Sequence, residues 1–144
     1  SRQLGKAPMK RGKFHQIVFL RAGCYNLFWG LYSVFDPQWF FRLSKLPLLN
    51  HPQIFSCLGM VVGVYGILYF EVARRPYEGF LIGAVGLLGK ILGPLGWAYF
   101  FLNGEWPLRS IVLILTNDLI WWIPFFIYLL DTKDKYLEDF KGNA

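Results

Sequence analysis

The sequence has few of the residues on which most enzyme chemistry depends. Its 144 residues include only two cysteines and two histidines. It contains no G-x-S-x-G, H-E-x-x-H, Walker loop or dinucleotide fingerprint. His15 and His51 are predicted at opposite ends of a helical bundle, so together they cannot hold one metal or haem. We therefore predict no catalytic residue and no metal site, and the sequence neither requires nor identifies a cofactor.

The two cysteines also lack the spacing of a redox or zinc site. Cys24 and Cys57 fall in different apolar segments, and no C-x-x-C occurs. In antiparallel helices they would lie toward opposite ends, beyond the roughly 7 Å that a disulfide allows between Cα atoms. We expect both to be free and buried as small apolar side chains.

Charge is scarce over long stretches of the chain. Charged residues make up 17% of the sequence, whereas 55% is hydrophobic and 19% is aromatic. That composition is more apolar than a soluble domain of this size needs. The net charge of +6 does not indicate nucleic acid, because the basic residues flank apolar segments rather than forming one basic face. We predict an all-α integral membrane protein with no nucleic-acid partner.

Four apolar segments are long enough to cross a bilayer as helices. Asp36-Pro37 should end the first, because a residue before proline is pushed out of helical geometry. The aromatic, basic stretch from Trp39 to Lys45 suits a short interfacial helix. The predicted organisation is a basic lead over 1–16, a four-helix transmembrane domain over 17–130 with spans 17–35, 54–72, 79–102 and 108–130, and a charged tail over 131–144.

The basic residues predict the orientation of these spans. With four crossings both termini share one side, and ten basic residues fall on that side against three on the other. The positive-inside rule then places both termini in the cytoplasm. The ten are Arg2, Lys6, Lys10, Arg11, Lys13, Arg74, Arg75, Lys133, Lys135 and Lys141, and the three are Arg42, Lys45 and Arg109.

The third and fourth segments each carry one charge where the bilayer would be deepest. Lys90 lies about 16 Å into its helix and Asp118 about 15 Å from the other face, at 1.5 Å per residue. A lone charge at that depth costs from about 3 to more than 10 kcal/mol. The two charges therefore form either a structural ion pair that sets helix register or an ionisable site for a ligand, an ion or a proton.

Further polar and aromatic residues are predicted near this pair. Asn117 and Asn26 fall at a similar depth, and Tyr65, Trp121 and Trp122 are candidates to line a cavity. Pro94 and Pro124 each free a backbone carbonyl in the preceding turn, so Pro94 either opens a small polar pocket beside Lys90 or is a tolerated kink. A second ion pair, between Arg21 and Glu71, is predicted near one membrane face.

Glycines are spaced so that two helices can pack closely. Gly59 and Gly63 form a G-x-x-x-G in the second span. In the third span the glycines recur at steps of four and three residues, which puts Lys90 on their face and predicts that it points into the bundle. This second set is Gly79, Gly83, Gly86 and Gly93.

The layout of the chain over about Phe14 to Leu130 resembles the DoxX-like group of small bacterial membrane proteins. The resemblance is carried by four short spans, an apolar outer loop, the Arg74-Arg75 turn and the polar Asn117-Asp118 pair. It implies a four-helix bundle and a membrane partner, because some members accompany quinone-linked oxidoreductases and others sit within membrane redox complexes. Similar small proteins carry an alkyl hydroperoxide reductase label, which would imply a C-x-x-C pair that this sequence lacks.

These observations support two functional hypotheses. The first is a non-catalytic subunit or accessory protein of a larger membrane complex, of redox, photosynthetic or respiratory type. The second is a membrane protein that binds a quinone, a lipid or a proton at Lys90 and Asp118. The expected partners are membrane lipid and either other membrane subunits or further copies of the chain, and the expected location is the bacterial inner membrane.

Overall fold

The computed structural model describes residues 10–144, and every regular element in that range is helical. This confirms the predicted all-α fold. Residues 1–9, with Arg2 and Lys6 of the predicted basic lead, lie outside the described residues. The elements are α1 (Gly12–Phe35), α2 (Trp39–Leu43), α3 (Pro52–Arg74), α4 (Phe80–Leu102), the 3-10 turn η1 (Leu108–Ser110), α5 (Ile111–Ile114), the π turn η2 (Leu115–Leu119) and α6 (Ile120–Gly142).

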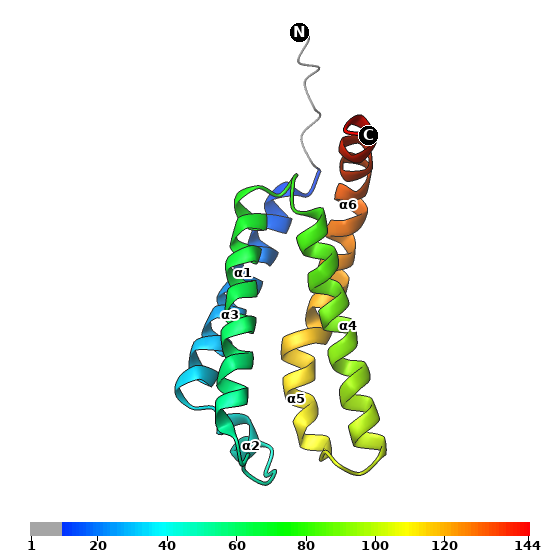
Figure 1. Ribbon diagram of the computed structural model, residues 1–144. Helices are drawn as coiled ribbons and strands as arrows, with labels where there is room; N and C mark the ends of the chain where they lie inside the picture. Colours follow the sequence, from blue (N-terminus) through cyan, green and yellow to red (C-terminus); the bar gives the residue numbers. More distant parts are fainter. Residues whose placement is uncertain (1–9) are drawn as a thin grey trace.

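The helices form two antiparallel hairpins that lie side by side (Figure 1). One hairpin is α1 with α3, and the other is α4 with the long helix that runs from Leu108 to Gly142. The predicted tail is thus a continuation of the fourth helix rather than a separate segment. The start of α1, the turn between α3 and α4, and the end of α6 lie at one end of the bundle, and α2 lies at the other.

Glycine brings α1 and α3 into backbone contact. A Cβ atom built on Gly30 would lie 2.5 Å from the carbonyl oxygen of Gly59, and one on Gly66 would lie 2.7 Å from that of Gly23. Neither site has room for a methyl group unless the helices separate. Gly63 is different, because a Cβ there would meet only the Cα of Gly30, at 3.9 Å. The close approach depends on Gly59 and Gly66 of α3 and on the glycines of α1.

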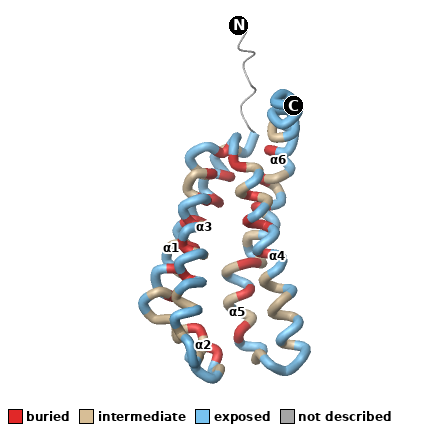
Figure 2. The backbone as a smooth tube through the Cα atoms, in the orientation of Figure 1, coloured by how far each residue is buried: buried red, intermediate tan, exposed pale blue. Residues whose placement is uncertain are grey.

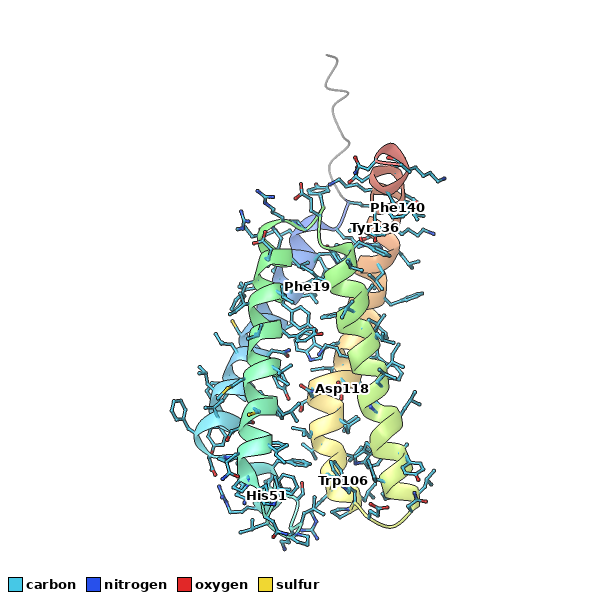
Figure 3. The ribbon with its side chains drawn as sticks, viewed as in Figure 1. Phe19, His51, Trp106, Asp118, Tyr136 and Phe140 are labelled. Atoms are coloured by element: carbon cyan, nitrogen blue, oxygen red, sulfur yellow. The ribbon has the colours of Figure 1, made fainter. Side chains whose placement is uncertain are left out.

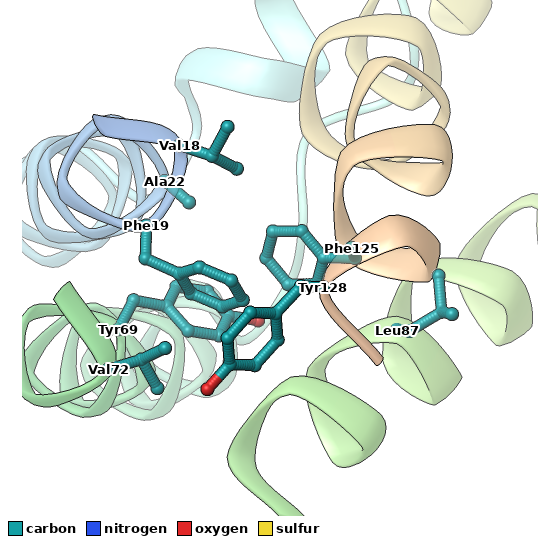
Figure 4. Close-up of a cluster of buried hydrophobic side chains, with 8 residues drawn as sticks. All are labelled: Val18, Phe19, Ala22, Tyr69, Val72, Leu87, Phe125 and Tyr128. Atoms are coloured by element: carbon teal, nitrogen blue, oxygen red, sulfur yellow. The ribbon is translucent and has the colours of Figure 1, made fainter. Parts of the chain in front are cut away.

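An aromatic cluster joins the two hairpins (Figure 4). The ring of Phe19 on α1 stacks on Phe125 of α6, with centroids 4.5 Å apart, and packs edge-on against Tyr128 at 4.6 Å. Tyr69 of α3 meets Phe125 from the side, at 5.4 Å. These rings are fully or almost fully buried, so they form the core of the bundle near the end where α1 begins.

The outer surface of the helices is largely apolar. Figure 2 shows buried residues on the facing sides of the helices and exposed residues on their outer sides. Large apolar side chains such as Phe28, Ile54 and Ile123 are each at least 70% exposed. This arrangement is typical of helices that face lipid.

Within residues 10–144, three helices are long and apolar enough to cross a membrane: Pro52–Arg74, Phe80–Leu102 and Leu108–Gly142. Only 22% of the apolar window of each is buried within the bundle. This finding supports an integral membrane protein. Helix α1, predicted as the first of four spans, does not reach the same apolarity, because Arg21, Asn26 and several tyrosine and tryptophan rings interrupt it.

One local expectation is wrong, and another is confirmed with an added detail. Cys24 and Cys57 are free, but both are exposed rather than buried. The short helix predicted near Trp39 is present as α2, and one of its rings points inward: Phe40 is 2% exposed and packs against Phe55 and Trp106.

The two glycine environments give a matched test of helix packing. We expect Gly30→Ala to lower the free energy of unfolding by about 1–3 kcal/mol, because its Cβ would press on the α3 backbone. Gly63→Ala should be neutral or stabilising by up to about 1 kcal/mol, since alanine favours a helix and the space is there. Thermal unfolding in detergent compares the two, and equal effects would contradict this account of the α1–α3 contact.

Candidate functional site

Lys90 lies on the inner face of α4, on the same side as the glycines. Its side chain is almost wholly buried, at 4% exposure. The glycines of this face leave space for large side chains from the other helices: Gly79 and Gly83 lie against Tyr128, Gly86 against Tyr69, and Gly93 against Asp118. Lys90 therefore lies where α4 is approached most closely by its neighbours.

The ammonium group of Lys90 donates a hydrogen bond to a backbone carbonyl of the opposite helix. Its Nζ lies 2.8 Å from the carbonyl oxygen of Asn117, which belongs to the π turn Leu115–Leu119. A π turn shifts the backbone hydrogen bonds by one residue and leaves carbonyls available to other donors. Apolar surroundings would offer no donor to the free carbonyl of this turn. Lys90 supplies that donor and thereby stabilises the turn.

Two tryptophans cap further carbonyls nearby. The indole of Trp122 donates to the carbonyl of Lys90, at 2.8 Å. Pro94 leaves this carbonyl without a helical hydrogen bond, because proline has no N–H group. The indole of Trp122 supplies the missing donor, so the proline does not open a separate pocket there. The indole of Trp121 donates to the carbonyl of Thr116, at 3.0 Å.

Asp118 is buried as deeply as Lys90, at 4% exposure, but the two groups do not form an ion pair. Among the described residues no contact within 4.0 Å joins the ammonium and the carboxylate. The carboxylate instead lies against the bare Cα of Gly93 and accepts a hydrogen bond from the side-chain amide of Asn117, at 3.3 Å. Of the two alternatives that the sequence leaves open, a direct ion pair does not form in this structure, and one N–H group of Lys90 donates to the carbonyl of Asn117 instead.

Aromatic rings surround the ammonium group of Lys90. Its Nζ lies 5.5 Å from the ring centre of Phe125, 5.7 Å from that of Trp121 and 5.8 Å from that of Tyr69. The faces of such rings attract a cation, more strongly when water is excluded. The charge of Lys90 is thus held by a carbonyl, by three rings and by the more distant field of Asp118.

A cavity of about 270 Å³ lies beside Lys90, between α3 and α4. Figure 3 shows Asp118 about midway along the bundle. Asn26 lies deep in the site at 6% exposure, and its Oδ1 has no hydrogen-bond partner among the described protein atoms. The cavity brings together Lys90, Asp118, Asn117 and Asn26 with Tyr65, Tyr69, Val61, Val62, Val85, Gly86 and Gly89.

Not every predicted site residue reaches this cavity. Trp121 and Trp122 are not among its lining residues, because their indoles cap backbone carbonyls. The predicted ion pair between Arg21 and Glu71 does not form. Glu71 accepts two hydrogen bonds from Arg74, one helical turn further along α3, at 2.6 and 2.9 Å.

One polar cluster was not predicted from the sequence. Arg11, just before α1, and His15 of α1 both donate to Asp131 of α6, at 2.8 and 2.7 Å to the same oxygen. The hydrogen bond to Asp131 also raises the pKa of the Arg11 guanidinium above its ordinary value. His15 is completely buried. The sequence did contain an indication of this cluster, because all three residues flank apolar segments on the side that the predicted topology assigns to both termini.

Comparison of the chain with family models, with curated proteins and with solved structures finds no match. Any functional assignment therefore depends on the geometry of the cavity and its lining residues.

The roles of Lys90 and Asp118 can be separated by a double-mutant cycle. Lys90→Met should lower the free energy of unfolding by about 3–5 kcal/mol, because it leaves Asp118 as an uncompensated buried charge and the Asn117 carbonyl without its donor. Adding Asp118→Leu should recover part of that loss. Unfolding of the two single variants and the double variant, measured in one detergent, tests this, and additive losses would show that the charges do not act together.

Proposed function

We propose that this protein binds a membrane-dissolved molecule with a small polar head in the cavity beside Lys90. The observation that carries the proposal is the combination of buried charged and amide side chains with a cavity edge made of exposed apolar residues. Val61 of α3 and Val85 of α4 line the cavity and are 54% and 41% exposed. In a bilayer such residues face lipid, so the cavity opens sideways between α3 and α4.

The polar groups in the cavity favour a head that accepts hydrogen bonds. An ammonium group has three N–H donors, and Lys90 uses one of them on the Asn117 carbonyl. The unpartnered Oδ1 of Asn26 offers an acceptor on the opposite wall. A molecule with a carbonyl and a hydroxyl or N–H group would match both.

The size and the walls of the cavity narrow the class of ligand further. About 270 Å³ is slightly below the range of roughly 300–1,000 Å³ that holds a whole drug-sized ligand, so only a head group would enter. Tyr65 and Tyr69 provide flat aromatic walls. A quinone fits this size and these walls, because its ring carries carbonyls that can accept from Lys90 and its apolar tail can remain in the lipid. The hydroxyl groups of its reduced quinol form can in addition donate to Oδ1 of Asn26. A phospholipid head is bulkier, and a proton would need no aromatic wall.

The membrane arrangement that we infer has four crossings with both termini in the cytoplasm of a bacterial cell. Helix α1 has 24 residues, enough to cross a hydrocarbon core of about 30 Å, and it packs on α3 through glycine contacts. The basic residues at the two ends of the described chain support the same orientation. The layout is also consistent with a DoxX-like protein.

Quinone binding can be tested by titrating the purified protein in nanodiscs with a short-tailed ubiquinone and following tryptophan fluorescence. We expect saturable quenching that Lys90→Met weakens at least about tenfold, as expected for the loss of one charged hydrogen bond. Val85→Phe should also weaken it, because the larger ring would obstruct the cavity edge.

The matched control is Leu88→Phe, since Leu88 is an exposed residue of the same helix that does not line the cavity. Quenching that stays unsaturated, or that changes equally in Val85→Phe and Leu88→Phe, would contradict binding in this cavity. Saturable binding of phospholipid in place of quinone would favour the lipid alternative.

A second candidate function is that of a subunit in a larger membrane complex. One observation favours it: a Cβ atom on Gly89 or Gly96 of α4 would meet nothing within 4 Å. The spacing of seven residues is the same as that of Gly23 and Gly30, through which α1 approaches α3. The outer face of α4 is thus suited to close approach by a helix of another chain.

This candidate predicts that Gly96→Leu dissociates the protein from its native assembly, because the added side chain would keep a partner helix away. Leu95→Phe changes a neighbouring exposed residue and should leave the assembly intact. Native-gel migration of gently solubilised membranes reports the result. If the unchanged protein already migrates as a monomer, the subunit proposal is wrong.

A further inference from the structure

A second and larger hollow lies at the other end of the bundle, where the two hairpins diverge. Its volume is about 740 Å³ and it lies between α1 and α2 on one wall and η1 and α5 on the other. It shares no lining residue with the cavity beside Lys90. We call it the α1–α5 groove, and its lining is Tyr25, Phe28, Trp29, Tyr32, Trp39, Phe40, Arg42, Leu43, Ser44, Arg109, Ser110, Val112, Leu113 and Thr116.

The lining of the groove is mostly apolar. Its walls are mostly aromatic rings from α1 and α2, with Val112 and Leu113 of α5 opposite them. At the inner end a hydrogen bond of 3.1 Å joins the hydroxyl groups of Tyr25 and Thr116. From Thr116 back to Arg109 is seven residues, or about 10 Å of helix, so the groove is a channel of that order in length.

Both charged residues of the groove are arginines, and both lie at its outer end. Arg42 belongs to α2 and hydrogen-bonds Asp36, which occupies part of its guanidinium. Arg109 belongs to η1, is exposed, and forms no ion pair with any residue of the described chain. The outer end therefore carries a net positive charge beside an apolar channel.

We propose that the α1–α5 groove binds one anionic phospholipid. Its phosphodiester lies on Arg109 and Arg42 and one acyl chain lies in the channel. Guanidinium groups match phosphate oxygens with paired N–H donors, and basic pockets between membrane helices bind phosphate heads. About 740 Å³ is within the range of pockets that hold a drug-sized ligand. The length and apolarity of the channel suit a flexible hydrocarbon chain better than a polar ligand.

The pairing of other arginines shows what Arg109 lacks. At the opposite end Arg74 and Arg75 are already paired with Glu71 and Glu78. Arg109 has no such carboxylate partner among residues 10–144, so a lipid phosphate would supply its counter-charge. This inference is independent of the proposed binding at Lys90.

The test is native mass spectrometry of the full chain in detergent, with equal amounts of phosphatidylglycerol and phosphatidylcholine that carry the same acyl chains. We expect one retained lipid per protein, with phosphatidylglycerol preferred. Arg109→Gln should reduce that preference about tenfold, the effect of losing one charge-assisted hydrogen bond. Arg75→Gln, an exposed arginine at the other end, should leave it unchanged.

A second pair of variants tests the channel itself. Leu113→Trp would fill the groove and should lower the amount of retained lipid, whereas Leu115→Trp changes an exposed residue outside the lining and should not. Equal retention of both lipids, a preference that survives Arg109→Gln, or equal effects of the two tryptophans would overturn the proposal. If added glycerol phosphate is retained and displaces the bound phosphatidylglycerol, the ligand is a free phosphate and not a lipid.

Discussion

A backbone carbonyl inside a membrane bundle must find a donor, because lipid offers none. Among the places in the second hairpin where the helix leaves carbonyls free are the turn before Pro94 and the π turn Leu115–Leu119. The facing helix supplies the donors: Lys90 reaches the carbonyl of Asn117, and Trp122 reaches the carbonyl of Lys90. These two bonds run in opposite directions between α4 and the last helix, so they hold the hairpin at one register. The position of the polar cavity depends on that register.

The first hairpin is stabilised in a different way. Backbone contact between α1 and α3 is possible because Gly30 and Gly59 carry no side chain where they meet. The two hairpins then meet through large rings, with Phe19 between Phe125 and Tyr128. The first hairpin is held by small residues, and the large rings that join the two hairpins lie toward the opposite end. The space between the hairpins near α2 is therefore less filled by side chains. That is where the α1–α5 groove opens.

Much of this arrangement could be predicted from residue spacing. The steps of four and three residues that link Gly83, Gly86, Lys90 and Gly93 placed the lysine inside the bundle, which is where it lies. The π turn could not be predicted, because Thr116-Asn117-Asp118 has no local feature that separates it from an ordinary helical turn. For the same reason the sequence left open whether Lys90 and Asp118 pair directly, since equal depth does not show which other acceptors lie within reach of the ammonium group. The contacts of Asp131 with α1 depend on how the hairpins pack, which spacing along one helix does not report.

The π turn also has a consequence for how the last helix is phased. It amounts to one extra residue in a helix with 3.6 residues per turn, so it rotates everything after it by about 100° relative to a regular helix. Thr116 and Asp118 both lie within the turn, and they line the groove beside α1 and the cavity beside Lys90 respectively. The rotation acts on the residues that follow the turn, which include the rings of α6 that pack against α1. Removing it would turn Phe125 and Tyr128 away from Phe19 and separate the two halves of the fold.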